Sequence, residues 1–116
     1  MPQGAYEEAV AACDACAAAC DACLSACLLE PEVTPLARCI ALDLECAALC
    51  RLLSGFSIRG SKFAPKLAEA CKTLCDACAE ECGRHEHGHC RRCAEACRAC
   101  SVACDRLLSL GVEAPG

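Results

Sequence analysis

Cysteines are the residues of this sequence with the greatest capacity for chemistry, because they supply 17 of its 116 residues. Thiolate is a soft ligand that binds Cu(I), Zn(II) or iron–sulfur clusters. A lone cysteine is more often a small buried apolar residue, but this density exceeds the level that marks a disulfide or metal-binding scaffold. The cysteines form four groups: Cys13, Cys16, Cys20, Cys23 and Cys27; Cys39, Cys46 and Cys50; Cys71, Cys75, Cys78 and Cys82; and Cys90, Cys93, Cys97, Cys100 and Cys104. We expect all 17 to be metal ligands.

The spacing within the groups predicts helices. Successive cysteines are three or four residues apart, except for one step of seven in the second group. This is the 3.5-residue period of a bundle seam, so each group lies on one face of one helix. The sequence therefore predicts an all-α protein: an antiparallel up-down-up-down four-helix bundle with a cysteine-lined core. It forms a single domain over residues 1–116, with helices near 6–29, 35–54, 62–85 and 88–109.

Proline and glycine residues mark the connections between these helices. Pro31 is expected to end the first helix just before it. Thr34 followed by Pro35 is typical of an N-cap with proline at the first helical position. Gly55 and Gly60 are expected to bracket the second connection.

Antiparallel packing of the helices would stack their seams in layers. From one end of the bundle to the other, the expected layers are Cys13, Cys50, Cys71 and Cys104; Cys16, Cys46, Cys75 and Cys100; Cys20, Cys78, Cys97 and Asp43; Cys23, Cys39, Cys82 and Cys93; and Cys27, Cys90, Leu36 and His85. A buried carboxylate is unfavourable unless it is paired or ligating. Asp43 could thus be an oxygen ligand in the core, or the helix could rotate so that Leu42 points inward and Asp43 is solvated.

The two ends of the bundle are expected to differ. A hydrophobic plug is predicted beyond the Cys13 end, formed by Leu52, Leu53, Phe56, Ile58, Phe63, Leu67, Leu107, Leu108 and Leu110. All three histidines lie at the Cys27 end: His85, His87 and His89. They could simply be solvated, but His85 continues the seam of the third helix and His89 adjoins Cys90. We expect neutral imidazoles there to help capture and release the metal, and acid to weaken these sites.

Charge favours Cu(I) as the metal. Zn(II) bound by four thiolates leaves a net charge of −2 at each site, and burying several such sites would be unfavourable. At roughly one Cu(I) per thiolate, the core is nearly neutral. Two cysteines three or four residues apart on a helix can grip one ion, whereas four convergent ligands are expected more often from loops. Iron–sulfur clusters likewise favour cysteines borne on loops. The expected cargo is therefore many Cu(I) ions per chain.

Composition and sequence pattern exclude several other classes of function and location. A net charge of −5 and a pI of about 5.1 argue against a nucleic-acid binder. The N-terminus lacks the pattern of a signal peptide, and no uninterrupted apolar run reaches 18 residues, so neither secretion nor a transmembrane helix is expected. In a reducing cytoplasm, dense cysteines indicate metal binding rather than disulfides. A structural disulfide bundle is an alternative, although an odd cysteine count leaves at least one thiol unpaired.

The chain resembles the copper storage proteins, in particular the cytosolic branch without a signal peptide. The resemblance extends from Tyr6 to Leu110, and its most specific part is Cys71-x3-Cys75-x2-Cys78-x3-Cys82, then His85 and His89, then Cys90-x2-Cys93-x3-Cys97-x2-Cys100-x3-Cys104. It implies a cysteine-lined bundle that holds Cu(I) within each protomer, with metal uptake at the histidine-bearing end. It also implies a homotetramer and an acidic core ligand, for which Asp43 is the matching position.

The expected function is cytoplasmic storage and buffering of Cu(I), not catalysis, because no nucleophile–base pair or open catalytic position is evident. A copper chaperone or an efflux system could exchange copper with the protein. The alternative function is detoxification of zinc or of soft metals in general, in the manner of a metallothionein.

Overall fold

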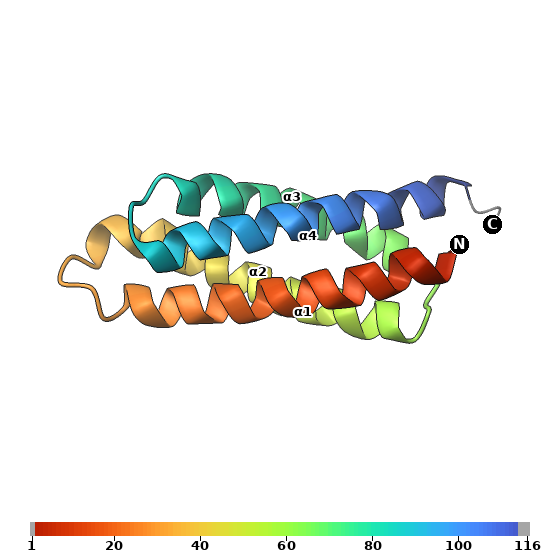
Figure 1. Ribbon diagram of the computed structural model, residues 1–116, viewed down its shortest axis with the longest axis horizontal. Helices are drawn as coiled ribbons and strands as arrows, with labels where there is room; N and C mark the ends of the chain where they lie inside the picture. Colours follow the sequence, from red (N-terminus) through yellow and green to blue (C-terminus); the bar gives the residue numbers. More distant parts are fainter. Residues whose placement is uncertain (1, 114–116) are drawn as a thin grey trace.

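The computed structural model describes residues 2–113, and the surroundings of side chains for residues 4–110. In this part of the chain, four long helices follow one another with a short 3-10 helix, η1, after the first. Their bounds are α1 (Pro2–Cys27), η1 (Thr34–Leu36), α2 (Ala37–Ile58), α3 (Ala64–Gly83) and α4 (Gly88–Glu113). The predicted all-α, antiparallel four-helix bundle with a cysteine core is confirmed (Figure 1).

The helices form an elongated bundle of 51 × 19 × 17 Å. α1 packs against α2 and α4, and α3 packs against the same two helices. The α1–α2 and α3–α4 connections lie together at one end, whereas the start of α1, the α2–α3 connection and the end of α4 lie at the other (Figure 1). We call these the histidine end and the apolar end. Because all four cysteine faces turn toward one axis, the fold places the thiols in a single interior column.

α1 starts earlier and ends earlier than the range 6–29 predicted for it. It begins at Pro2, since the missing N–H of proline is no loss in the first helical turn. It ends at Cys27, after which the N–H of Leu29 bonds the carbonyl of Ala26 and the N–H of Glu30 bonds that of Cys27. These bonds span three residues, so the chain tightens before Pro31 and leaves Glu30 in a turn.

α2 extends four residues beyond its predicted end. Residues 34–36 form η1, so α2 starts at Ala37, and it continues through Gly55 to Ile58. Gly60 has a φ of 65°, which favours glycine. Its N–H bonds the carbonyl of Ser57, and the N–H of Ser61 bonds that of Phe56. This pair of bonds is a Schellman motif, and it explains why Gly60, and not Gly55, ends the helix.

The last two helices also differ from their predicted bounds. α3 covers Ala64–Gly83 instead of 62–85, because Ser61 holds the preceding turn: its hydroxyl accepts a hydrogen bond from the N–H of Phe63 at 3.1 Å. α4 starts at Gly88 as expected and runs to Glu113, four residues past the predicted end.

The apolar end is closed by fewer side chains than predicted. Leu53 and Leu107 are fully buried, and four other members of the predicted plug pack partly buried against the core: Phe56, Leu67, Leu108 and Leu110. The other three members of the predicted plug are exposed: Leu52, Ile58 and Phe63. Leu52 turns outward because its neighbour Leu53 points inward, and successive helical residues are rotated by about 100°. Small residues, among them Ala9, Ala64 and Ala68, fill this end instead.

By length and composition alone, α1 is apolar enough to cross a membrane, with a mean hydropathy of 1.5 within Gly4–Cys27. A core helix passes the same test, and α1 buries all five of its cysteines inside the bundle. Its apolar character is thus accounted for by the fold.

Candidate metal centre

All 17 cysteines are free thiols with no solvent exposure. Neighbouring Sγ atoms along the column lie 3.0 to 4.0 Å apart, the shortest pair being Cys39 and Cys82 and the longest including Cys46 and Cys50. A metal–sulfur bond of about 2.3 Å lets two sulfurs nearly 4 Å apart share one ion that a third sulfur also binds. The column can therefore hold metal with little movement of the helices, and the disulfide alternative finds no bonded pair among these cysteines.

The sulfurs of α1, α2 and α3 follow the predicted layers. Cys46 Sγ lies 3.8 Å from that of Cys16 and 3.7 Å from that of Cys75. The next layer toward the apolar end pairs Cys50 with Cys71 at 3.7 Å. These three helices thus share one register along the bundle axis.

α4 departs from that register by about half a layer. Cys100 Sγ lies 3.7 Å from that of Cys13 and 3.8 Å from that of Cys50, although the prediction placed it with Cys16. Cys97 Sγ contacts Cys16 Sγ at 3.6 Å and Cys20 Sγ at 3.8 Å, so it too bridges two layers. The sulfurs therefore form one staggered column and not separate planes, because antiparallel seams interdigitate as knobs between holes.

The stagger creates compact groups of four thiols, whose sulfurs all lie within 4.8 Å of one another. Among them are Cys13, Cys71, Cys100 and Cys104; Cys16, Cys46, Cys50 and Cys75; Cys20, Cys78, Cys93 and Cys97; and Cys23, Cys27, Cys39 and Cys90. Four convergent ligands, which were expected more often from loops, are therefore available within this helical bundle. Charge, and not ligand number, is what argues against zinc in this core.

Asp43 is fully buried, so the alternative in which it is solvated is not what the structure shows. Its Oδ1 accepts hydrogen bonds from the thiols of Cys93 at 3.2 Å, Cys78 at 3.3 Å and Cys82 at 3.5 Å, and Cys39 lies 3.8 Å from Oδ2. Burial, reinforced by the nearby Cys93 and Cys39, raises the pKa of Asp43 to about 8. The metal-free core thus favours a protonated carboxyl group at neutral pH.

Burial acts on the thiols at the histidine end in the same direction. Desolvation raises the pKa of Cys27 to about 11 and also raises that of Cys90. These thiols keep their protons at neutral pH when no metal is present. Because the thiolate is the form that binds metal, loading must release those protons.

His89 is the imidazole that reaches the thiols. Its Nδ1 lies 3.5 Å from the Sγ atoms of Cys23 and Cys90 and 3.8 Å from that of Cys27. Its Nε2 lies 2.9 Å from Oε2 of Glu30. The imidazole therefore sits between the last thiols of the column and a carboxylate at the histidine end.

His87 lies farther out and contacts the same carboxylate. Its Nδ1 is 3.3 Å from Oε2 of Glu30. Its ring stacks on that of His89, with centroids 5.2 Å apart and planes 4° from parallel. His87 thus supports His89 and the approach to the column.

His85 is placed differently from the expectation that it would continue the thiol seam. Its Nε2 lies 2.9 Å from Oε2 of Glu81, which is four residues earlier on α3 and almost buried. Arg84 Nη1 lies 3.3 Å and Arg38 Nε 3.7 Å from the other oxygen of Glu81. The resulting cluster joins the start of α2 to the end of α3 at the histidine end.

Two carboxylates of this end, Glu30 and Glu81, were missed by the reasoning from sequence. The four-residue separation of Glu81 from His85 was a usable signal. Glu30 offers no such signal, because it is 59 residues from His89 and meets it only through the antiparallel packing of α1 and α4.

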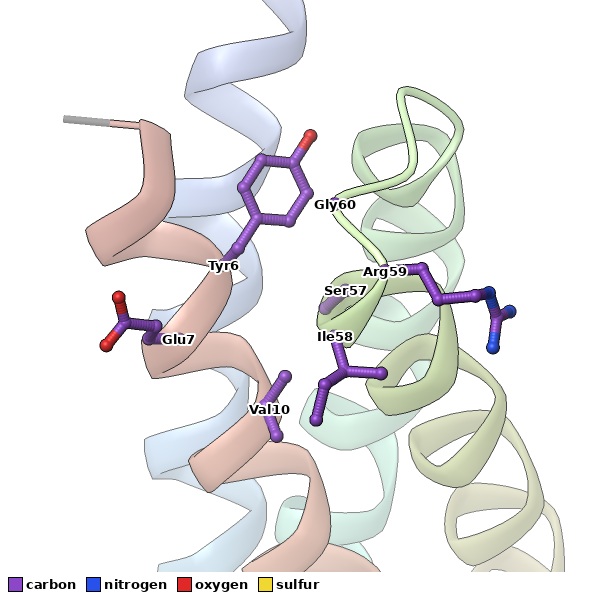
Figure 2. A pocket seen from close by; sticks show the side chains of 7 residues that line it. All are labelled: Tyr6, Glu7, Val10, Ser57, Ile58, Arg59 and Gly60. Carbon is purple, nitrogen blue, oxygen red and sulfur yellow. The ribbon is translucent and has the colours of Figure 1, made fainter.

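A surface groove of about 510 Å³ lies far from the histidines, at the apolar end. Figure 2 shows Tyr6, Val10 and Ile58 facing the space between α1 and α2, whereas Glu7 and Arg59 point away from it. The groove is lined by neither cysteine nor histidine. It therefore supplies no ligand that would suit a soft metal.

The comparisons with known proteins agree on one family. Residues 2–109 match the profile of the family described as copper storage protein. The chain is 41% identical over 100 residues to the uncharacterized cysteine-rich protein YhjQ of Bacillus subtilis, covering 85% of this chain and 93% of that protein.

Solved structures give the same result. A cytosolic copper storage protein from Streptomyces lividans with five coppers is 41% identical, with a TM-score of 0.89, and the match covers 93% of this chain and 95% of that one. The Cu(I)-bound copper storage protein BsCsp3 is 38% identical, with a TM-score of 0.85, over 90% of this chain and 98% of that one.

Proposed function

Since this chain belongs to the copper storage protein family, we propose that all 17 thiols are storage ligands and that His89 admits the metal. The chain binds multiple Cu(I) ions through its core cysteines and is not an enzyme. The observation that carries the proposal is the unbroken burial of free thiols between Leu53 and Leu107 at one end and His89 at the other. A column closed at one end has one natural route for its cargo.

The storage ligands are tested by removing one thiol group. Anaerobic titration of the reduced protein with Cu(I), against a competing chelator, counts the tightly bound ions. The triple variant Cys16→Ser, Cys46→Ser, Cys75→Ser should bind fewer ions than the wild type. Ala47→Ser is the matched control, because it places the same hydroxyl at a buried position next to Cys46 and removes no thiol. Equal capacity in the triple variant would rule out these three as ligands.

The same titration separates storage of Cu(I) from handling of zinc. Groups of four thiols are available, so zinc is a real competitor on geometry. We expect Cu(I) to displace bound zinc completely, because a monovalent ion neutralises one thiolate while Zn(II) with four thiolates leaves −2 in the core. Retention of zinc in the presence of an equal concentration of Cu(I) would favour the metallothionein-like alternative.

The route is tested by comparing two histidines. His89→Ala should slow Cu(I) transfer from a chelator, and should slow its removal, while the final number of bound ions stays nearly unchanged. His85→Ala is the comparison, since His85 is held by Glu81, and we expect a smaller effect from it. His87 and Asp43 are the remaining proposed ligands, the first at the approach to the column and the second inside it. Unchanged kinetics in His89→Ala would exclude the proposed route.

Three further features belong to this proposal. A homotetramer is supported by membership of the family, and by Leu44 and Leu52, which are exposed and eight residues apart on α2; sedimentation of the reduced protein measures it. A cytoplasmic location is supported by similarity to the cytosolic protein of Streptomyces lividans. Exchange with a copper chaperone or an efflux protein at the histidine end is supported by the exposed Leu28 and Leu29 beside it.

A further inference from the structure

The histidine end contains a carboxylate, Glu30, that has no part in the uptake route proposed above. Glu30 lies in the turn after α1, and its side chain is three-quarters buried. Its Oε2 is 2.9 Å from Nε2 of His89, and the opposite ring nitrogen, Nδ1, is the one that faces the thiols of Cys23 and Cys90 at 3.5 Å. Carboxylate, imidazole and thiols thus follow one another in a line.

The chemistry of the three groups fixes where the proton of the imidazole lies. A neutral imidazole carries one N–H donor and one lone pair, and an ionised carboxylate can only accept hydrogen bonds. Beside Glu30, Nε2 must therefore be the donor. The lone pair is then on Nδ1, which points at the end of the thiol column and can bind a soft cation.

Metal-ligating histidines commonly donate their second ring N–H to a carboxylate, which fixes the tautomer and strengthens the ligand. We propose that Glu30 is a positioning residue for copper uptake, which holds His89 in the tautomer that presents a lone pair to incoming Cu(I). This inference rests on the proposed role of His89 and deepens it.

The neighbours of the pair support a positioning role. His87 Nδ1 is 3.3 Å from the same carboxylate oxygen, and its ring stacks on that of His89. The stacking limits rotation of the His89 ring, and the carboxylate sets its direction. The Glu81–His85 pair lacks this arrangement, because Arg84 and Arg38 share its carboxylate. Its two partners are also only four residues apart in the chain, Glu81 on α3 and His85 just after that helix.

The test measures the tautomer and the rate separately. Long-range ¹⁵N–¹H correlation spectra of the reduced, metal-free protein should show His89 protonated at Nε2. In Glu30→Gln, the side-chain amide can donate as well as accept, so both tautomers should appear. Transfer of Cu(I) from a chelator should become about tenfold slower, while the number of ions bound at equilibrium stays the same.

A control and a double variant distinguish positioning of His89 from direct attraction of the cation. Glu32→Gln removes the same charge from an exposed position in the same connection, and should change neither the tautomer nor the rate. If Glu30 acts through His89, adding Glu30→Gln to His89→Ala should cause no further slowing. A further slowing there would show that Glu30 attracts the cation by itself, and would overturn the inference.

The outcomes also separate this inference from the proposed route. If His89→Ala loads as fast as the wild type, the route itself is wrong. If His89→Ala is slow, but Glu30→Gln keeps the single tautomer or loads at the wild-type rate, the route stands and the positioning role of Glu30 is refuted.

Discussion

Replacing Asp43 by asparagine should make the metal-free protein more stable at neutral pH. In the folded protein, burial raises the pKa of this carboxyl group from its ordinary value of 3.8 to about 8. Between these two values, the unfolded chain gives up the proton and the folded chain keeps it. The unfolded state then binds fewer protons, so the free energy of unfolding falls as pH rises from about 4 to about 8. Asparagine resembles the protonated carboxyl group and cannot ionise.

The size of the effect follows from the shift. A pH of 7 is about three units above 3.8, the ordinary pKa that this carboxyl group has in the unfolded chain, and each unit corresponds to about 1.4 kcal/mol. The variant should therefore be more stable than the wild type by up to about 4 kcal/mol at pH 7, and by only about 1 kcal/mol at pH 4.5, which is less than one unit above 3.8.

Guanidinium unfolding of the reduced, metal-free proteins, followed by circular dichroism at several pH values and one protein concentration, measures this difference. Glu45→Gln, at an exposed position on the same helix, controls for the change in net charge. Parallel curves for the wild type and Asp43→Asn between pH 4.5 and 7 would refute the reasoning, because they would mean that the buried carboxyl group titrates as it does in water.

Three further perturbations test the core. Loading with Cu(I) at pH 7 should release protons from Cys27 and Cys90, since burial raises the pKa of both thiols. A pH indicator in weak buffer should record the release, and a constant pH would mean that these thiols are already ionised in the metal-free core. Hydrogen peroxide should join Cys39 and Cys82 by a disulfide first, since their sulfurs are 3.0 Å apart. The two thiols lose two electrons and two protons, and peroxide becomes two waters. Peptide mass mapping identifies the first disulfide, and a different first pair would contradict this prediction. Leu53→Ala should destabilise the metal-free protein by about 2–5 kcal/mol without lowering copper capacity, whereas Val102→Ala, at an exposed position, should destabilise it by less than about 0.5 kcal/mol. Equal losses in thermal or denaturant unfolding would contradict the assignment of the apolar end.

The period of the cysteines made the fold predictable. Steps of three and four residues leave no secondary structure but helix with one thiol face, and four such faces can be buried together only against one another. The sequence did not decide whether Asp43 points inward, because the cysteines of α2 are more widely spaced, with a seven-residue step between Cys39 and Cys46. A small rotation over that gap exchanges Leu42 for Asp43, and in the structure both are buried.

Other features depend on three-dimensional packing and had no signal in the sequence. The half-layer displacement of α4 is set by how side chains from neighbouring helices interlock, and a shift of one or two residues preserves the pattern of every helix. The pairing of Glu30 with His89 depends on that displacement and on the turn before Pro31. The extension of α2 past Gly55 was hidden because a glycine is tolerated inside a helix at a cost of about 1 kcal/mol.

The staggered thiol column also has a consequence for how such proteins can change in size. Each heptad adds about 10 Å to a helix and brings two new seam positions, so inserting one heptad into all four helices creates eight interior sites. The terminal parts, Leu53 and Leu107 at one end and Glu30 with His89 at the other, need not be redesigned. The number of metal ions that such a bundle can hold therefore depends on the length of its helices. The same apolar end and the same histidine end can serve bundles of different length.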